Sequence, residues 1–343
     1  MEFSNSLIHW YLQNKRDLPW RNTSDPYTIW LSEIILQQTR VAQGLPYFEA
    51  FITAFPTVFD LAKASEEQVL KLWQGLGYYS RARNLHATAK LVVDEYNGNF
   101  PNAYEKLIKL KGIGEYTAAA IASFSADENV AVLDGNVYRV LARYFNVDND
   151  ISISSTKKVF QELAKEVLPK KNAAIHNQAI MEFGALQCVP KSPNCMSCVL
   201  GDSCEALKLK LVNSLPVKSK KTKVTNRFFT YLVFEDLEGN TSVKHRTEKG
   251  IWQNLYEFPV IESESIIEED EVITSISKRY SHIKSVSMLS SFDVVHKLSH
   301  QTLHIRFVKV ELLSFLDESI AINELKKLPF PIVIHKFIER YFS

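Results

Sequence analysis

The chain's four cysteines fall in one short stretch, with the spacing Cys188-x6-Cys195-x2-Cys198-x5-Cys204. Four thiolates this close in sequence can surround a single small inorganic centre. A disulfide framework is disfavoured, because the N-terminus lacks the basic head and apolar run of a secretory leader. The residue types alone leave two chemistries open, a closed tetrahedral zinc site and an iron–sulfur cluster.

Glu33 is a carboxylate inside the apolar run WLSEIIL at 30–36. On a helix it would share a face with Trp30 and Leu36 and would be partly desolvated. Desolvation favours the neutral acid, and a carboxylic acid with a raised pKa suits proton donation near neutral pH. The alternative is an ordinary exposed helix glutamate.

Asp134 lies in the segment VLDGNV at 132–137. An aspartate just before a helix is a favoured N-cap, which is a structural role. A capping carboxylate is also held rigidly, so the same residue can stabilise positive charge that develops beside it.

The segment LKGIGEYT at 110–117 places two glycines one residue apart between two helical patterns. A tight turn of this kind exposes backbone amides at the start of a helix, where they can bind a phosphate without reading sequence. An ordinary helix–helix turn is the alternative. The leucine before the glycines and the small-residue helix after them favour the phosphate-binding hairpin.

All of these residues fall in a region, 1–205, whose apolar spacing is mainly helical. Residues 206–226 are rich in lysine and predict a linker. Residues 227–343 contain strand patterns at Arg227–Glu235 and Leu303–Glu311 and predict an α+β domain that closes with a helix at Ile334–Phe342. The helices expected in the first region are Tyr27–Val41, Ser65–Leu72, Arg83–Tyr96, Thr117–Phe124 and Val137–Phe145.

The 343 residues include 46% hydrophobic side chains, which is typical of a globular chain with two domains. No apolar stretch approaches the about 18 residues of a membrane span, so we expect a cytosolic protein, or a nuclear or mitochondrial one in a compartmented cell. The net charge of +1 does not by itself indicate nucleic acid. Six lysines between 208 and 223 are typical of a solvated linker, and six acids between 262 and 271 of a solvated helix end.

The cysteine spacing after a long helical region resembles the cluster loop of the endonuclease III superfamily of DNA glycosylases. The segments LPWR at 18–21, WLSE at 30–33 and LQQT at 36–39 further resemble the MutY-type adenine DNA glycosylases. This resemblance implies a helical domain with a helix–hairpin–helix at about 108–124, and one 4Fe–4S cluster held in the loop 188–204. It covers nearly the whole chain and is most specific in residues 18–204.

The resemblance also implies catalytic roles. Glu33 would protonate adenine, and Asp134, with Asn136 nearby, would stabilise the sugar as the base leaves. Strand-cutting relatives carry a nucleophilic lysine where this chain has Tyr116, so strand cleavage by a Schiff base is not expected.

A base must leave the stack before an acid can reach it, so DNA-opening residues are expected as well. The segment GLGYYSRARN at 75–84 resembles the family's wedge. The implied DNA contacts are Gln38, Leu76, Tyr78, Arg81, Arg83, Gly112, Gly114 and Lys191, and Arg21 is implied in substrate recognition.

The segment KGIWQNLYEFP at 249–259 resembles a Nudix-like C-terminal domain, which in this family reads 8-oxoguanine. The metal-binding R-E-x-x-E-E helix of true Nudix hydrolases is absent, so pyrophosphatase activity is not expected. The family's Phe-Ser-His recognition motif corresponds to Leu298, Ser299 and His300, and Leu298 departs from the aromatic residue.

The expected protein is therefore a monofunctional adenine DNA glycosylase of base excision repair. It would be a monomer acting on duplex DNA with adenine opposite 8-oxoguanine or guanine. A strand-cutting glycosylase, a non-catalytic lesion-binding protein and a Nudix hydrolase are the alternatives. Tyr116 argues against the first, the two carboxylates against the second, and the missing metal motif against the third.

Overall fold

Helices form the first of two units in the computed structural model, which describes residues 2–219 and 223–343. This unit comprises Met1–Lys63 and Asn84–Lys220, and the second comprises Ala64–Arg83 and Lys221–Ser343. The first unit contains, along the chain, α1 (Glu2–Asn14), α2 (Pro26–Leu36), α3 (Val41–Ala54), α4 (Val58–Lys63), most of α6 (Ser80–Tyr96), α7 (Tyr104–Leu107), α8 (Glu115–Ala126), α9 (Gly135–Tyr144), α10 (Thr156–Val167), α11 (Ala173–Leu186) and α12 (Glu205–Lys208).

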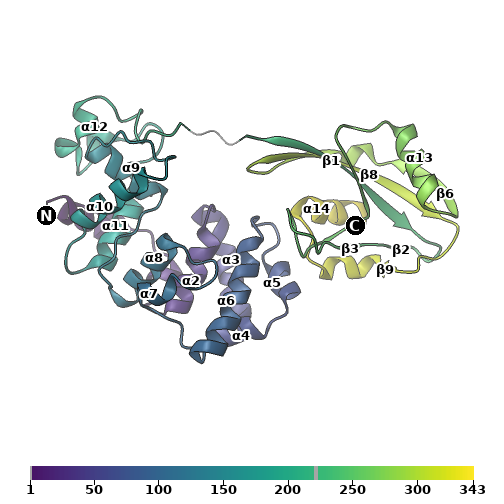
Figure 1. The fold of residues 1–343 in the computed structure, drawn as a ribbon, viewed down its shortest axis with the longest axis horizontal. Coiled ribbons are helices and arrows are strands. Elements are labelled where there is room, and N and C mark those ends of the chain that lie inside the picture. Colours follow the sequence, from purple (N-terminus) through teal and green to yellow (C-terminus); the bar gives the residue numbers. More distant parts are fainter. Residues whose placement is uncertain (1, 220–222) are drawn as a thin grey trace. The chain divides into compact units, whose positions relative to one another are not determined.

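The core of the first unit forms around α8 and α11 (Figure 1). The small residues of α8, from Thr117 to Ser123, are all buried, which lets neighbouring helices approach closely. The α11 helix contributes Ala179, Ile180 and Phe183 to the same core. These two helices therefore form a rigid support for residues at their ends.

The helix expected from Tyr27 to Val41 is shorter in the structure. Asp25 caps its start through the amides of Tyr27 and Thr28, but α2 ends at Leu36. Gln38 then adopts a left-handed backbone with φ of 56°, and α3 begins at Val41. The apolar pattern continues across this break because both helices bury apolar residues, so periodicity alone did not reveal it.

The second unit contains a mixed sheet with the strand order β5-β1-β8-β6, and β7 pairs with β8. The two long strands β1 (Thr225–Glu235) and β8 (Gln301–Leu312) are parallel and central, with Phe228 opposite His304. The antiparallel strands are β5 (Val260–Ser263), β6 (Ile283–Met288) and β7 (Val294–Lys297). Two short pairs complete the strands, β2 (Asn240–Thr241) with β9 (Ile320–Ala321) and β3 (Lys244–His245) with β4 (Tyr256–Glu257).

One helix packs on each face of this sheet (Figure 1). On α14 (Ile332–Tyr341), Phe337 stacks on Phe307 with ring centroids 3.9 Å apart. On α13 (Glu269–Arg279), Val272 and Ile276 pack against alternate residues of β1 and β8. The predicted α+β second domain and mainly α first domain are both confirmed.

The segment Ala64–Arg83, which the sequence assigns to the helical region, groups with the second unit. It contains α5 (Glu66–Leu72), whose start is fixed by a capping box between Ser65 and Gln68. Lys71 Nζ donates to the carbonyl of Leu328 at 3.0 Å, and Arg83 Nη1 donates to that of Gln253 at 2.9 Å. These bonds link residues more than 150 positions apart, which local patterns do not reveal.

The segment expected as a linker is ordered along the first unit up to its residue 219. It begins with α12, Leu215 is buried, and Arg143 Nε donates to the carbonyl of Leu215 at 3.0 Å. The Ile151 amide donates to the carbonyl of Val217, and Ser219 hydrogen-bonds Asp150. Residues 220–222 lie outside the described residues. Within the described ranges, no helix combines the length and apolar character needed to cross a membrane.

Candidate active site and DNA interface

A cavity of about 610 Å³ in the first unit brings together four of the predicted catalytic residues. Its walls come from α2, the start of α3 with the loop before it, α8, α9, α11, Pro190 and the residues after α1. The residues predicted to be catalytic that line it are Glu33, Tyr116, Asp134 and Asn136.

Glu33 lies on α2 with only 6% of its surface exposed. The Tyr116 hydroxyl donates to Glu33 Oε2 at 2.7 Å. Burial raises the pKa of Glu33 to about 7; the bond from Tyr116 opposes this rise, and the charge of Asp134 adds to it. Near neutral pH Glu33 is therefore present partly as a neutral acid that can donate a proton.

Asp134 is the N-cap of α9 and accepts from the Val137 amide at 2.7 Å and from Asn136 Nδ2 at 2.8 Å. Burial raises its pKa, and these hydrogen bonds oppose the rise because they favour the charged form. The cap and a charge facing the cavity are thus compatible, as the sequence suggested. The two carboxylates differ in environment, since donors hold Asp134 on two sides.

Glu182 also lines the cavity, although no motif in the sequence had indicated it. It is 1% exposed and bridges two arginines, with Arg21 Nη2 at 2.7 Å and Arg16 Nε at 2.8 Å. Burial alone would raise the pKa of Glu182, but the hydrogen bonds from Arg21 and Arg16 outweigh it and hold that pKa at about 2. An acid within the apolar helix pattern of α11 was the available signal, as it was for Glu33.

Arg139 connects the cavity to the first cysteine. Its Nη2 donates to Asn136 Oδ1 at 2.8 Å and to the Gly184 carbonyl at 2.6 Å, and its Nε donates to the Cys188 carbonyl at 2.7 Å. A Cβ added at Gly184 would lie 2.7 Å from Asn136 Cβ, so only glycine allows α11 to approach α9 here.

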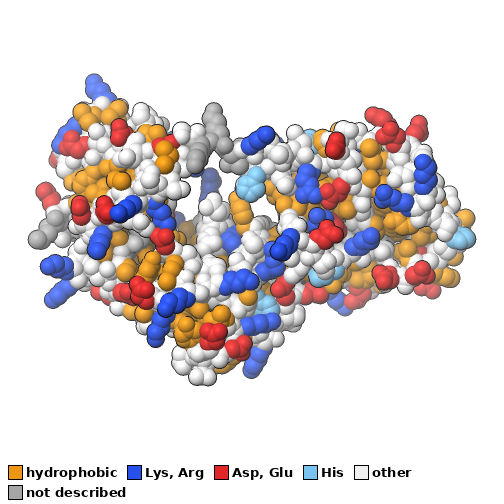
Figure 2. All heavy atoms as spheres, in the orientation of Figure 1, with side chains coloured by type: hydrophobic (Ala, Val, Ile, Leu, Met, Phe, Trp, Pro, Cys, Tyr) orange, Lys and Arg blue, Asp and Glu red, His pale blue; other side chains and the backbone are white. Residues whose placement is uncertain are grey.

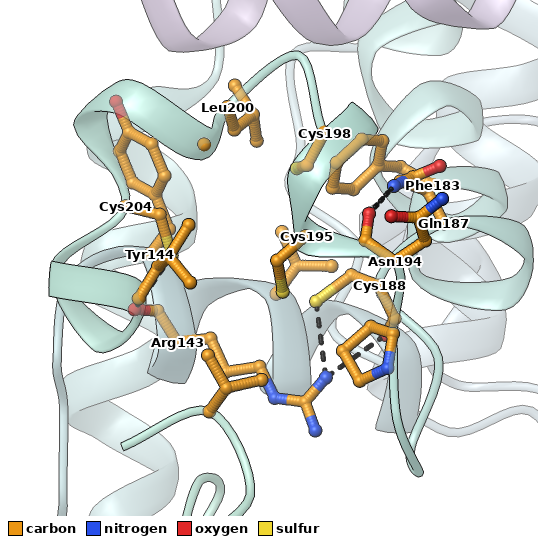
Figure 3. A pocket seen from close by; sticks show the side chains of 15 residues that line it. Arg143, Tyr144, Phe183, Gln187, Cys188, Asn194, Cys195, Cys198, Leu200 and Cys204 are labelled. Atoms are coloured by element: carbon orange, nitrogen blue, oxygen red, sulfur yellow. Dashed lines mark hydrogen bonds between the residues drawn. The ribbon is translucent and has the colours of Figure 1, made fainter. Parts of the chain in front are cut away.

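The four cysteines line one small cavity of about 30 Å³. Figure 3 shows the sulfur atoms of Cys188 and Cys195 pointing toward each other, with the guanidinium of Arg143 beside Cys188. Arg143 Nη1 lies 3.4 Å from Cys188 Sγ and donates to the Val189 carbonyl at 2.8 Å. Arg143 therefore places a positive charge beside one of the four sulfur atoms. Within the described residues, no group of three or more histidine, cysteine or acidic side chains is arranged to hold a single metal ion.

The predicted hairpin connects α7 to α8. Gly112 has φ of 76°, which favours glycine, and Gly114 is the N-cap of α8. Both glycines are exposed, while Ile113 between them is buried as an anchor. The free end of α8 therefore presents amides to solvent, as phosphate binding requires. Lys191 and Gln38 are also exposed, each on a loop of the first unit.

The predicted wedge lies in the second unit, beside the recognition segment. Tyr78 is 47% exposed, with φ of 48°, and its hydroxyl hydrogen-bonds the Ser299 hydroxyl. Both residues line a cavity of about 380 Å³, together with Leu298 and His300.

Two of the residues predicted to contact DNA are buried in this structure, and their contacts with DNA stay predictions. Arg81, expected at a phosphate, is only 8% exposed, and its guanidinium lies 5.0 Å from the centroid of Trp73. Leu76 is 5% exposed, so it supports the loop rather than protruding from it. Arg83 is partly buried and its guanidinium donates to the Gln253 carbonyl. The sequence placed all these side chains on one loop but did not show which of them face inward.

The acidic run lies at the beginning of α13, where Glu269, Asp270 and Glu271 form the first turn. Negative charge is favourable there because of the helix dipole. This placement agrees with the solvated helix end that the sequence predicts.

Residues 31–170 match the model of the HhH-GPD superfamily of base excision DNA repair proteins, and residues 230–340 match that of the NUDIX domain. A solved thermostable thymine-DNA glycosylase superposes with a TM-score of 0.56 at 28% identity, covering 60% of this chain and 95% of that one. An endonuclease III–DNA complex superposes at 0.53 with 22% identity over 61% of this chain and 94% of that one, a likeness of fold.

The fold and the site thus define a helix–hairpin–helix base excision repair glycosylase with a C-terminal NUDIX domain. The adenine DNA glycosylase of Buchnera aphidicola from Schizaphis graminum is 36% identical over 91% of this chain and 88% of its own length. The human adenine DNA glycosylase is 42% identical over 60% of this chain and 39% of its own length. The chain belongs to the adenine DNA glycosylase family, and it is a hydrolase of base excision repair.

Proposed function

We propose that this enzyme excises adenine from duplex DNA in which the opposite base is 8-oxoguanine or guanine, without cutting the strand. The observation that carries the proposal is the pairing of Glu33 and Asp134 in one cavity, where the pKa of Glu33 is about 7. One group can supply a proton and the other a fixed negative charge, which is how glycoside-cleaving sites divide the work between two carboxylates.

In the first step the adenine is flipped into the cavity, and Glu33 donates its proton to a nitrogen of the imidazole side of the base. The N-glycosidic bond breaks and its electron pair goes to the protonated base, which leaves as neutral adenine. The anionic Asp134 stabilises the oxocarbenium character left on the sugar.

In the second step water attacks the sugar carbon, and its proton passes to the Glu33 carboxylate. The products are free adenine and an abasic site, and the enzyme returns to its starting protonation state. No lysine lies at position 116 to form a Schiff base, which supports hydrolysis without strand cleavage.

Recognition of the opposite base is proposed for the cavity formed by Tyr78 and the segment Leu298–His300. An exposed aromatic ring next to hydroxyl and imidazole groups can stack on an orphaned purine and hydrogen-bond its altered edge. The contact between Tyr78 and Ser299 supports a joint role, since it holds the wedge against the recognition segment.

The cysteine cavity is proposed to hold one 4Fe–4S cluster, which would organise the loop that carries Lys191. The four-thiolate donor set and the cation at Cys188 fit such a group. A brown preparation with broad visible absorption, containing about four iron atoms per chain, supports the cluster. Stoichiometric zinc in a colourless preparation overturns it.

The decisive experiment incubates the enzyme with duplexes that carry adenine opposite 8-oxoguanine, guanine or thymine. Strand breaks that appear only after alkali, and only with the first two duplexes, are expected. Breaks without alkali would indicate a lyase. The absence of any breaks would indicate a protein that binds the lesion without excising a base. Gel filtration with the same duplex tests the expected monomeric state.

A further inference from the structure

On one face of the second unit's sheet, α13 covers only half of the surface among the described residues. The α13 helix packs on Leu232, Phe234, Val308 and Val310, in the later halves of β1 and β8. The earlier halves of the two strands, with β7 beside them, form instead the floor of an open cavity of about 250 Å³. This cavity is separate from the proposed 8-oxoguanine site, and nothing in the proposed reaction uses it.

Apolar side chains line part of this cavity. Ile266 is 55% exposed on the loop before α13, and Val295 is 54% exposed on β7. Phe228 and His304 stack across the floor with ring centroids 4.6 Å apart. Contiguous exposed apolar side chains beside a hollow offer a surface that a partner can bury.

Several acidic residues lie next to the lining residues in the sequence, on the side that leads into α13. Glu264 and Glu268 flank the lining residues 265–267, and the acidic first turn of α13 follows directly. Figure 2 shows acidic side chains where Figure 1 places α13. Arg306, the one arginine or lysine of the lining, is paired with Asp293 at 3.4 Å and donates to the Ile267 carbonyl. The pairing leaves little positive charge for a phosphate, so a nucleic acid is disfavoured and a basic ligand is favoured.

The shape of the site favours an extended chain. Where the structure is described, β7 pairs with β8 alone, so its other edge can accept a further strand. A strand added there places alternate side chains over the cavity, and the residues between them face away. We propose that this face docks an extended, basic segment of a partner protein, with aliphatic side chains entering the cavity and lysines or arginines meeting the acids.

The same strand leads to the recognition segment. Lys297, the last residue of β7, is followed directly by Leu298, Ser299 and His300. A segment bound along β7 would therefore order the residues next to the proposed 8-oxoguanine contacts. Docking itself rests on β7 and the cavity alone, so it can be tested without DNA.

The test uses the full-length protein and a fluorescein-labelled heptapeptide that alternates lysine with valine, followed by fluorescence anisotropy. Saturable binding is expected, with a matched glutamate–valine peptide bound at least about tenfold more weakly. The double variant Ile266→Ser with Val295→Ser should weaken binding about tenfold, because two aliphatic contacts are lost. Leu313→Ser is the matched control, since Leu313 is 57% exposed but lies outside the cavity, and it should bind as the parent does.

The charge contribution is tested by Glu264→Gln with Glu268→Gln, which should weaken binding at low salt and change it little at high salt. Equal affinity for the two peptides, or no loss in the double aliphatic variant, would overturn the proposal. An oligothymidylate that binds this face and loses affinity in the aliphatic variant would also overturn it, as would a dimer that the variant dissociates.

Discussion

The hydroxyl of Tyr116 donates to Glu33 Oε2 at 2.7 Å, across 83 positions of sequence. Tyr116 thereby contacts the carboxylate that we propose as the general acid. The bond lowers the pKa of Glu33, against burial that raises it. One residue thus keeps the pKa of the acid near neutral pH, where a proton donor is most effective.

Glu33→Gln should abolish proton donation while keeping the shape of the side chain. We expect the single-turnover rate of adenine release to fall by about 10³-fold or more, with DNA affinity changed little. Alkaline cleavage assays and anisotropy with the same duplex measure the two quantities. Asp134→Asn is the companion variant, and full turnover in either one contradicts its assigned role.

Tyr116→Phe should change the pH dependence of the reaction. Proton donation needs the neutral form of Glu33, so the rate should fall as pH rises above about 7, the pKa of Glu33. Loss of the Tyr116 bond removes an interaction that lowers this pKa, so the alkaline fall should move to higher pH. Rates of single turnover between pH 5 and 9 test this, and an unmoved or lowered midpoint would contradict it.

Ser299→Ala combined with His300→Ala should reduce the preference for 8-oxoguanine over guanine. We expect the ratio of the two rates to fall about tenfold or more, because hydrogen bonds to the opposite base are lost. Excision opposite guanine is the internal control and should change less. An unchanged ratio would rule out the segment as the reader of the lesion.

Gly184→Ala should disturb the proposed catalytic site indirectly, because the added methyl group displaces Asn136. The added Cβ would lie 2.7 Å from Asn136 Cβ and force α9 and α11 apart. We expect a loss of about 1–3 kcal/mol in the free energy of unfolding and a slower adenine release. Gly135→Ala is the control for stability, since its Cβ meets open space, and equal melting temperatures would contradict the packing argument.

His176 should make the first unit sensitive to acid. Burial lowers its pKa from 6.5 to about 4, and its Nδ1 has no hydrogen-bond partner among the described residues. As pH falls below 6.5 the unfolded state takes up the proton first, so stability is lost between pH 6.5 and 4, by roughly 3 kcal/mol. In His176→Leu this loss should be smaller, as urea unfolding at pH 7.5 and 4.5 would show; an equal loss assigns the sensitivity to other groups.

The sequence alone determined which residues are candidates for the chemistry of this protein. These candidates come from local patterns, which are the cysteine spacing, Glu33 within an apolar helix, Asp134 before a helix and the two hairpin glycines. Each pattern can be interpreted from residues that are close together in the sequence. The main helices and the two long strands followed from periodicity for the same reason.

Only the tertiary structure decided which side chains meet. Glu182 joins Arg16 and Arg21 across more than 160 positions, and the segment Ala64–Arg83 groups with a domain that begins after residue 220. Burial of Arg81 and the exposure of Tyr78, three residues apart, also depend on what packs against the loop. Such contacts arise from the packing of segments that are distant in the sequence, and the hydrophobic periodicity of the sequence does not predict them.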